Sequence, residues 1–337
     1  MIKEKVKELW KLCFDDDERF IEMYFRLRYN NDVNIYMQQG EEVIAALQLI
    51  PYPMTFCGQT IHTSYISGAC THPNFRGKGT MRKLLTRSFA KMYQENAYLS
   101  TLIPAEPWLF DYYAQMGYAS VFSYSEKEVS NQTFILSKDI RIKEITAYDD
   151  KVYSYLNEKM RKRPCCIQHT EDDFRVILSD LAISKGNLIV AFKEEQIVGI
   201  AITYLRDNYL SIDELFAEDT NVQESLLAHI QSYSSGNAIT LITPPTAESK
   251  PLSVGMARII NVKAILELYA TFNPTCEINI ELIDTQLENN NGYYSIQKGK
   301  CIQSSNQLSD NYQQLTVGEL CQWLLPPLHP YMSLMLN

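Results

Sequence analysis

The sequence predicts a mixed α/β (α+β) fold, with two tandem mixed-sheet domains followed by a small C-terminal α/β domain. Three observations lead to this prediction. The helix and strand patterns of the first 124 residues follow the order ααββββαβαβ, which is typical of a sheet with helices on its faces. A second series in nearly the same order begins near residue 139. A third pattern follows residue 250, so we predict domains at 1–137, 138–250 and 251–337.

The first series opens with two amphipathic helices over residues 3–28, and Asp15 or Asp16 is the expected N-cap of the second. Alternating apolar residues separated by turns then predict a meander. Its strands are expected at 33–37, 43–50, 54–56 and 60–66, and residues 64–70 are expected to form the strand that leads into the next turn. The rest of the domain is a helix at 81–92, a strand at 98–103, a helix beginning at Pro107 and ending at Gly117, and a strand at 118–124.

The second series contains helices, a three-stranded meander, a helix and a strand. Expected helices are at 148–161, 171–182 and 222–233, and expected strands at 187–192, 196–204, 208–216 and 238–242. In the third pattern we expect strands at 276–282 and 293–297, a helix at 317–324 and an apolar tail at 328–337.

One turn in the first domain is suited to an anion. The run Arg76-Gly77-Lys78-Gly79 joins a strand to a helix. The first N–H groups of a helix have no partner within the helix, and the helix dipole adds positive charge there. Glycine lets a phosphate approach the backbone closely. At the matching place in the second domain, Phe216-Ala217-Glu218-Asp219 would repel phosphate, so that domain is expected to be a degenerate copy.

Two motifs in the right order resemble a known enzyme family. The run from His72 to Gly79 resembles motif A of the GNAT N-acyltransferases, [RQ]-x-x-G-x-[GA], with Met81 in place of the second small residue. The run 112–118, Tyr-Tyr-Ala-Gln-Met-Gly-Tyr, resembles the motif Y-x-x-[FM]-G-[FY] of that family. In having a large apolar residue at position 81, the motif is similar to that of the enhanced intracellular survival (Eis) branch of the family. The run 256–266 resembles the entry into the sterol-carrier-like C-terminal domain of that branch, with the central domain GNAT-like.

The resemblance implies roles for particular residues. Acetyl-CoA would be the co-substrate, bound by its pyrophosphate at the turn and by its pantetheine arm at the preceding strand. Tyr113 would be the general acid that protonates the CoA sulfur, with Tyr112 as a competing assignment. The chain's terminal carboxylate on Asn337 would be the base, with Glu106 and His72 as alternatives. The cofactor-binding set would be Ala69, Thr71, Arg76, Gly77, Lys78, Gly79 and Thr80.

Composition limits the classes of partner. A net charge of −9 argues against general nucleic-acid binding and is compatible with a cationic substrate. The charged N-terminus and the lack of a long apolar run predict neither a secretory signal nor a membrane span. Eight scattered cysteines and five histidines without ligand spacing predict buried reduced thiols, a cytoplasmic location and no metal site.

The expected function is therefore acetyl-CoA-dependent N-acetyl transfer, by direct transfer, to a primary amine on a small molecule or peptide. The alternative is a non-catalytic protein that binds CoA or an apolar ligand and keeps a vestigial GNAT site. The sequence leaves open the acceptor, the acyl chain length, any ligand of the C-terminal domain and whether the chain forms a homo-oligomer.

Overall fold

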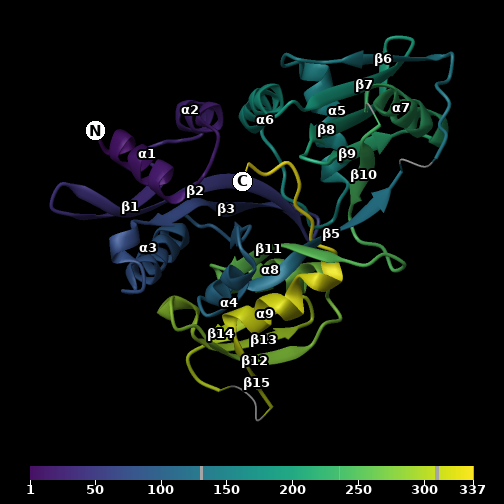
Figure 1. Cartoon of the computed structure of the whole chain (residues 1–337). Coiled ribbons are helices and arrows are strands. Elements are labelled where there is room, and N and C mark those ends of the chain that lie inside the picture. Colours follow the sequence, from purple (N-terminus) through teal and green to yellow (C-terminus); the bar gives the residue numbers. More distant parts are fainter. Residues whose placement is uncertain (130–131, 235, 308–310, 337) are drawn as a thin grey trace.

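A computed structural model describes the chain except residues 130–131, 235, 308–310 and 337. Over the described residues, eleven strands form one mixed sheet in the order β1-β2-β3-β4-β11-β5-β10-β9-β8-β7-β6 (Figure 1). Up to β5, the elements are α1 (Ile2–Cys13), α2 (Glu18–Leu27), β1 (Asn34–Gln39), β2 (Glu42–Phe56), β3 (Gln59–Thr71), η1 (Pro73–Phe75), α3 (Thr80–Gln94), β4 (Leu99–Leu102), α4 (Pro107–Ala114) and β5 (Ala119–Glu128).

The far half of this sheet repeats the topology of the near half. It contains β6 (Ile140–Glu144), α5 (Asp150–Arg161), α6 (Glu171–Ile183), β7 (Asn187–Lys193), β8 (Gln196–Leu205), β9 (Tyr209–Ala217), α7 (Thr220–Tyr233) and β10 (Ala238–Thr243). Strands β1, β2 and β3 are antiparallel neighbours and β4 is parallel to β3. Strands β7, β8, β9 and β10 pair in the same order and sense. The mixed α/β fold predicted from the sequence is confirmed.

Strand β11 (Leu252–Ile259) lies inside the near half of the sheet, although it follows β10 in the chain. It is antiparallel to β4 on one side and to β5 on the other. The outer end of β5 pairs with β10, and this pairing makes the two halves one continuous sheet. The sequence analysis assigned residues 252–259 to the third domain, whereas in space this strand lies among the strands of the first. The domain boundaries at 137 and 250 remain predictions.

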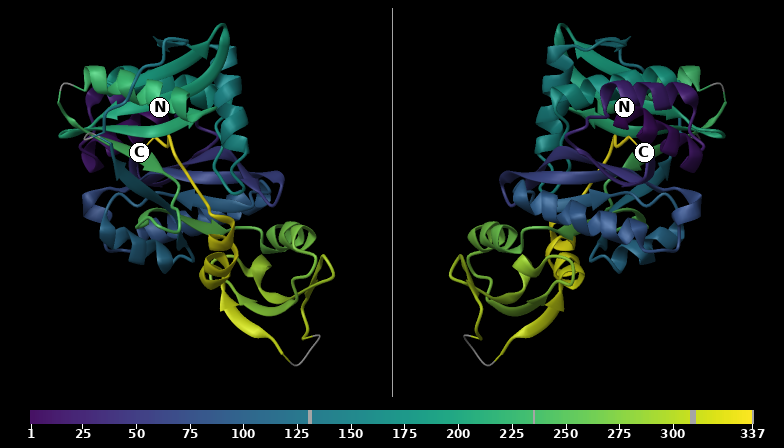
Figure 2. Two further views of the ribbon diagram at one scale, coloured as in Figure 1. Left: turned by 90° about the vertical axis from the view of Figure 1, so that its right-hand side faces the viewer. Right: turned by 90° about the vertical axis from the view of Figure 1, so that its left-hand side faces the viewer.

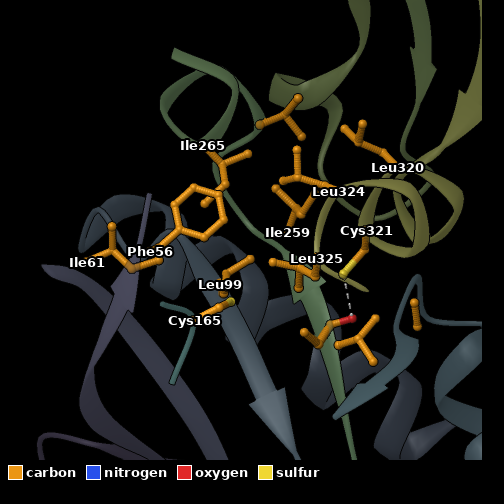
Figure 3. Close-up of a cluster of buried hydrophobic side chains, with 14 of the residues drawn as sticks. Phe56, Ile61, Leu99, Cys165, Ile259, Ile265, Leu320, Cys321, Leu324 and Leu325 are labelled. Atoms are coloured by element: carbon orange, nitrogen blue, oxygen red, sulfur yellow. Dashed lines mark hydrogen bonds between the residues drawn. The ribbon is translucent and has the colours of Figure 1, made fainter. Parts of the chain in front are cut away.

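After β11, a smaller unit packs beneath the large sheet (Figure 2). It contains α8 (Val262–Phe272), β12 (Ile278–Ile283), η2 (Glu288–Asn290), β13 (Gly292–Gln297), β14 (Lys300–Ser304), β15 (Gln313–Thr316), α9 (Val317–Leu324) and η3 (Pro326–Leu328). Its described strands form a sheet in the order β14-β13-β12-β15. Side chains of α8 and α9, including Ile265 and Leu320, join one apolar core with Phe56 and Leu99 from the large sheet (Figure 3).

A buried ion pair also joins this smaller unit to the large sheet. Arg258 on β11 and Asp284 after β12 are fully buried, with their charged atoms 2.7 Å apart. The Asp284 carboxylate also accepts hydrogen bonds from two backbone N–H groups and from Asn290. The Arg258 guanidinium lies 4.5 Å from the centre of the Phe89 ring on α3. The arginine in the run 256–266 therefore has a structural role, because it pairs with Asp284 and packs on Phe89 in the buried contact between the smaller unit and the large sheet.

Three local predictions are wrong. Asp17, and not Asp15 or Asp16, caps α2 and accepts a hydrogen bond from the Arg19 N–H. The strands expected at 43–50 and 54–56 are one strand, β2. Not all of the cysteines are buried, because Cys13, Cys276 and Cys301 are partly exposed.

Among the described residues, no helix is long and apolar enough to cross a membrane. Within the same part of the chain, no group of three or more His, Cys, Asp or Glu side chains is arranged to hold a metal ion. A cytoplasmic location remains a prediction.

Candidate active site

The basic turn between β3 and α3 presents an open backbone. Gly77 and Gly79 have φ angles of 72° and 73°, a conformation that side chains with a Cβ rarely adopt. A Cβ built on either glycine would have no neighbour within 4 Å. Glycine is therefore required here by the backbone conformation, and the space in front of the turn is free for a ligand.

The same turn leaves helix α3 without a side-chain cap. Gly79 is its N-cap residue, and no side chain accepts a hydrogen bond from the first turn. Within the described part of the chain, the backbone N–H groups of Gly77, Lys78, Gly79 and Thr80 have no hydrogen-bond acceptor. Unpartnered amides at a helix N-terminus form a ready anion site.

The basic side chains of the turn are held by its own backbone. Arg76 Nε donates to the Thr71 carbonyl at 3.0 Å, and Lys78 Nζ donates to the Asn74 carbonyl at 2.8 Å. Both side chains are exposed, so they can turn toward an anion without breaking buried contacts. His72 accepts from the Asn74 N–H at 3.2 Å and lies 3.2 Å from Glu42. This histidine therefore stabilises the turn.

The matching turn of the far half differs in this respect. Asp219 is the N-cap of α7, and its carboxylate accepts a hydrogen bond from the Val222 N–H at 3.0 Å. A carboxylate thus occupies the position that an anion would take. This contrast supports the sequence prediction that only the first turn is suited to phosphate.

Strand β3 separates from β4 just before the turn. The two strands pair only from Thr63 to Tyr65, whereas β3 continues to Thr71. Gly68 and Ala69 form a bulge, because the pairing with β2 skips from Ser67↔Gln48 to Cys70↔Ala46. The later part of β3, which includes Ala69 and Thr71, therefore has a backbone edge that β4 does not cover.

Tyr113 lies on α4 and is 7% exposed. Burial raises the pKa of its hydroxyl above the usual value for tyrosine, and neighbouring Tyr112 adds to this effect. No hydrogen bond is found from this hydroxyl to another described residue. The ring of Tyr113 packs against Tyr118 in the core, whereas Tyr112 contacts the exposed Trp108 at the rim. Burial therefore distinguishes the two tyrosines.

A cavity of about 490 Å³ lies where the two halves of the sheet meet. Its wall is formed in part by Ile103, which directly follows β4, by Phe20 on α2 and by the C-terminal tail from Tyr331 to Leu336. Among the described residues, its charged lining consists of the carboxylates of Glu126, Asp180 and Asp213 and the guanidinium of Arg206.

Two of these carboxylates are largely buried. Burial raises the pKa of Asp180 and that of Asp213 above the usual value. Arg206 donates to Asp213 Oδ2 at 2.9 Å, but the buried Oδ1 has no partner among the described residues. The described lining of the cavity therefore carries net negative charge, and one buried carboxylate oxygen beside it has no partner.

The C-terminal tail runs from α9 into the junction between the two halves (Figure 1). Tyr331 pairs with the backbone of residues 165–167, and His169 Nε2 donates to the Ser333 carbonyl at 2.9 Å. Leu336 packs with Met23 on α2 and Val176 on α6. Asn337, the predicted base, lies outside the described residues. The tail thus leaves its own unit and lines the cavity.

The sequence search did not find the acidic cavity. Its carboxylates come from α6, β5 and β9, which are far apart in the sequence, and no short motif links them. An aspartate inside an apolar strand, such as Asp213 next to Ile212, is the one local signal. A buried charge in a strand needs a partner or a ligand, so this position could have been noted.

Comparison with known families identifies the first part of the chain. Residues 3–121 match the family model described as an acetyltransferase (GNAT) domain. This segment is a GNAT acyltransferase domain. The match includes the turn at Arg76–Gly79 and the helix that carries Tyr113. No curated protein matches the sequence.

Solved structures resemble nearly the whole chain at low sequence identity. A probable N-acyltransferase of unknown function from Enterococcus faecalis V583 has a TM-score of 0.77 at 16% identity, over 95% of this chain and 86% of that one. A GCN5-related N-acetyltransferase from Anabaena variabilis gives 0.76 at 15% identity, over 98% and 96%. Eis1 from Mycobacterium abscessus gives 0.73 at 14% identity, over 96% and 87%. At such identities the likeness is one of fold, and a sterol-carrier-like C-terminal domain remains a prediction.

Proposed function

We propose that this protein is an acetyl-CoA-dependent N-acetyltransferase that transfers the acetyl group directly to a primary amine. The observation that carries the proposal is the turn from Gly77 to Thr80, with four unpartnered N–H groups in front of open space. These amides would hold the pyrophosphate, with Arg76 as a charged partner. Bound acetyl-CoA would supply the acetyl thioester.

The uncovered edge of β3 would bind the pantetheine arm. An extended ligand can add to an open strand edge through backbone hydrogen bonds. Ala69 is on this edge as part of the bulge, and Thr71 is on it between the bulge and the turn. The same backbone groups would orient the thioester carbonyl toward the acceptor.

Tyr113 would hold the proton that the departing sulfur needs. Its raised pKa keeps the hydroxyl protonated at neutral pH, and the hydroxyl has no fixed acceptor that would compete for the proton. The base is not assigned by the described residues. Asn337 remains the predicted base, and His72 is occupied in the turn.

The acidic cavity supports an amine as the acceptor. An ammonium group in the cavity would favour the charged form of both buried carboxylates. Ile103 at the end of β4 lines the cavity, and β4 is the strand that separates from the proposed pantetheine edge. On this proposal, an amine in the cavity would reach the thioester from the side of β4.

The first test concerns the turn. We expect Gly79→Val to place a side chain where pyrophosphate approaches, and Arg76→Glu to repel it. Each should raise the dissociation constant for acetyl-CoA at least about tenfold, or about 1.4 kcal/mol, in isothermal titration calorimetry. Gly40→Val is the matched control, because Gly40 has a φ of 58° and equally open surroundings in the β1–β2 hairpin. Unchanged affinity in both turn variants would contradict the CoA site.

The second test concerns the acceptor. Asp213→Asn keeps the size of the side chain but removes its charge, so the amine loses a charge-assisted hydrogen bond. We expect the KM for the amine to rise about tenfold while the KM for acetyl-CoA stays the same, in steady-state assays of thiol release. Asp139→Asn, at an exposed carboxylate paired with Lys193, is the control. An equal effect of both variants would argue against an acceptor site in the cavity.

A further inference from the structure

Cys13 on α1 and Cys70 on β3 belong to one packed cluster where α1 crosses β3, directly before the turn. Trp10 on α1 covers Gly68 so closely that a Cβ there would lie 2.0 Å from the indole ring. One helical turn later, Cys13 Sγ lies 3.4 Å from the Thr71 carbonyl oxygen. Cys70, the residue before Thr71, belongs to the buried cluster against which Cys13 packs. The step from Trp10 to Cys13 on the helix thus matches the step from Gly68 to Thr71 on the strand.

The two thiols have different surroundings. Cys70 is 4% exposed, and its interaction with Cys13, together with burial, raises the pKa of its thiol. Cys13 is partly exposed at the end of α1. Hydrogen bonding with Cys70, and then the charges of Arg76 and His72, lower the pKa of Cys13 to about 6. A partly exposed thiolate beside a second thiol is the usual arrangement of an oxidation-sensitive cysteine.

This pair is connected to the turn through one carbonyl oxygen. The Thr71 oxygen is 3.4 Å from Cys13 Sγ and also accepts the hydrogen bond from Arg76 Nε at 3.0 Å. A negative charge on Cys13 therefore lies close to the guanidinium that we assign to the pyrophosphate. Any chemistry that removes this charge should change the potential at the turn.

We propose that Cys13 and Cys70 form a reversible disulfide with peroxide as the oxidant, and that the disulfide strengthens acetyl-CoA binding at the neighbouring turn. The second half of this inference rests on the proposed function, whereas the first half does not. Oxidation replaces a thiolate by a neutral disulfide, so the phosphates would no longer be repelled by Cys13.

The chemistry balances with hydrogen peroxide alone. The Cys13 thiolate attacks one peroxide oxygen, an S–O bond forms, the O–O bond breaks, and the departing hydroxide takes a proton to become water. The Cys70 thiol then attacks the Cys13 sulfur, the S–S bond forms and the S–O bond breaks. The proton from Cys70 leaves with the second hydroxide as water. Two thiols are oxidised and one peroxide is reduced to two waters, and a dithiol reductant reverses the change.

Mass spectrometry tests the disulfide directly. The reduced full-length protein is treated with hydrogen peroxide, denatured, alkylated and digested. We expect a cross-linked peptide pair containing Cys13 and Cys70, which disappears with dithiothreitol and is absent in Cys13→Ser and in Cys70→Ser. Cys276→Ser, at another partly exposed cysteine, should still form it. Oxidation of Cys13 to sulfinic acid without the cross-link, or no reaction at Cys13, would overturn the proposal.

Calorimetry tests the effect on the turn. We expect the oxidised protein and the reduced Cys13→Ser variant to bind acetyl-CoA more tightly than the reduced protein, by roughly twofold, the effect of one unit charge about 8 Å away in water. If the oxidised, cross-linked protein and the reduced protein bind acetyl-CoA equally well, the proposed effect on the turn is wrong, although the disulfide itself is still established. If acetyl-CoA binds to no form, the proposed function fails, and the peptide result still decides whether the disulfide exists.

Discussion

Tyr113→Phe is expected to lower kcat by roughly 10²-fold, the low end for a lost general acid, while the dissociation constant for acetyl-CoA stays the same. The change removes one hydroxyl and leaves the ring, which packs against Tyr118 with centroids 5.7 Å apart. Binding at the turn and at β3 does not use this hydroxyl. Stopped reactions with quantified CoA thiol give kcat, and calorimetry gives the affinity.

Tyr112→Phe is the matched control for this experiment, because the neighbouring ring is only half buried on the same helix. A loss of activity in Tyr112→Phe with normal activity in Tyr113→Phe would reverse the assignment. The pH profile gives a second check. Because burial raises the pKa of Tyr113, its proton remains bound through neutral and mildly alkaline pH, and the rate should not fall from its ionisation below about pH 10.

Arg258→Met is expected to lower the free energy of unfolding by about 3 kcal/mol, because it leaves the buried carboxylate of Asp284 without its cation. Both side chains are fully buried, so solvent cannot replace the lost partner. Urea unfolding followed by circular dichroism measures the change. Arg141→Met is the matched control, because the pair of Arg141 with Glu195 is largely exposed and should be worth about 0–1 kcal/mol.

A double variant separates the charge from the packing. When Asp284 is also replaced, as in Arg258→Met with Asp284→Asn, no unpaired charge remains, the side-chain oxygen can still accept from the backbone N–H groups of Gln286 and Leu287, and part of the stability should return. A double variant that is as unstable as the sum of the two single changes would show that the ion pair does not act as a unit. An Arg258→Met protein as stable as Arg141→Met would contradict the prediction outright.

Local signals in the sequence predicted the elements well where a short motif fixes the backbone. The glycines at 77 and 79 predicted the open turn, and the apolar spacing of Leu84, Leu85 and Phe89 predicted the buried face of α3. The two strands expected at 43–50 and 54–56 are the single strand β2, which continues through Pro51 and Pro53. Every second residue of a strand has its backbone nitrogen on the same side, so the nitrogens of Pro51 and Pro53 are on the same side as that of Thr55. The Thr55 N–H is directed away from β3 and donates to the Cys166 carbonyl. Proline is tolerated there because no bond to β3 is lost.

Contacts between distant parts of the sequence were beyond local reasoning. The place of β11 between β4 and β5 depends on pairing across more than a hundred residues. The acidic cavity likewise unites carboxylates from three separate elements. In contrast, the anion turn lies within a few residues of sequence, so this part of the candidate site could be predicted and its acceptor side could not.

The position of β11 has a consequence for how the protein is made. A ribosome completes β4 and β5 long before it reaches β11, yet the two strands do not pair with each other in the finished sheet. During synthesis the nascent N-terminal segment must either keep a gap between them or form a temporary pairing that later opens. We therefore expect fragments that stop before residue 252 to be poor at reaching the native state and prone to engage chaperones.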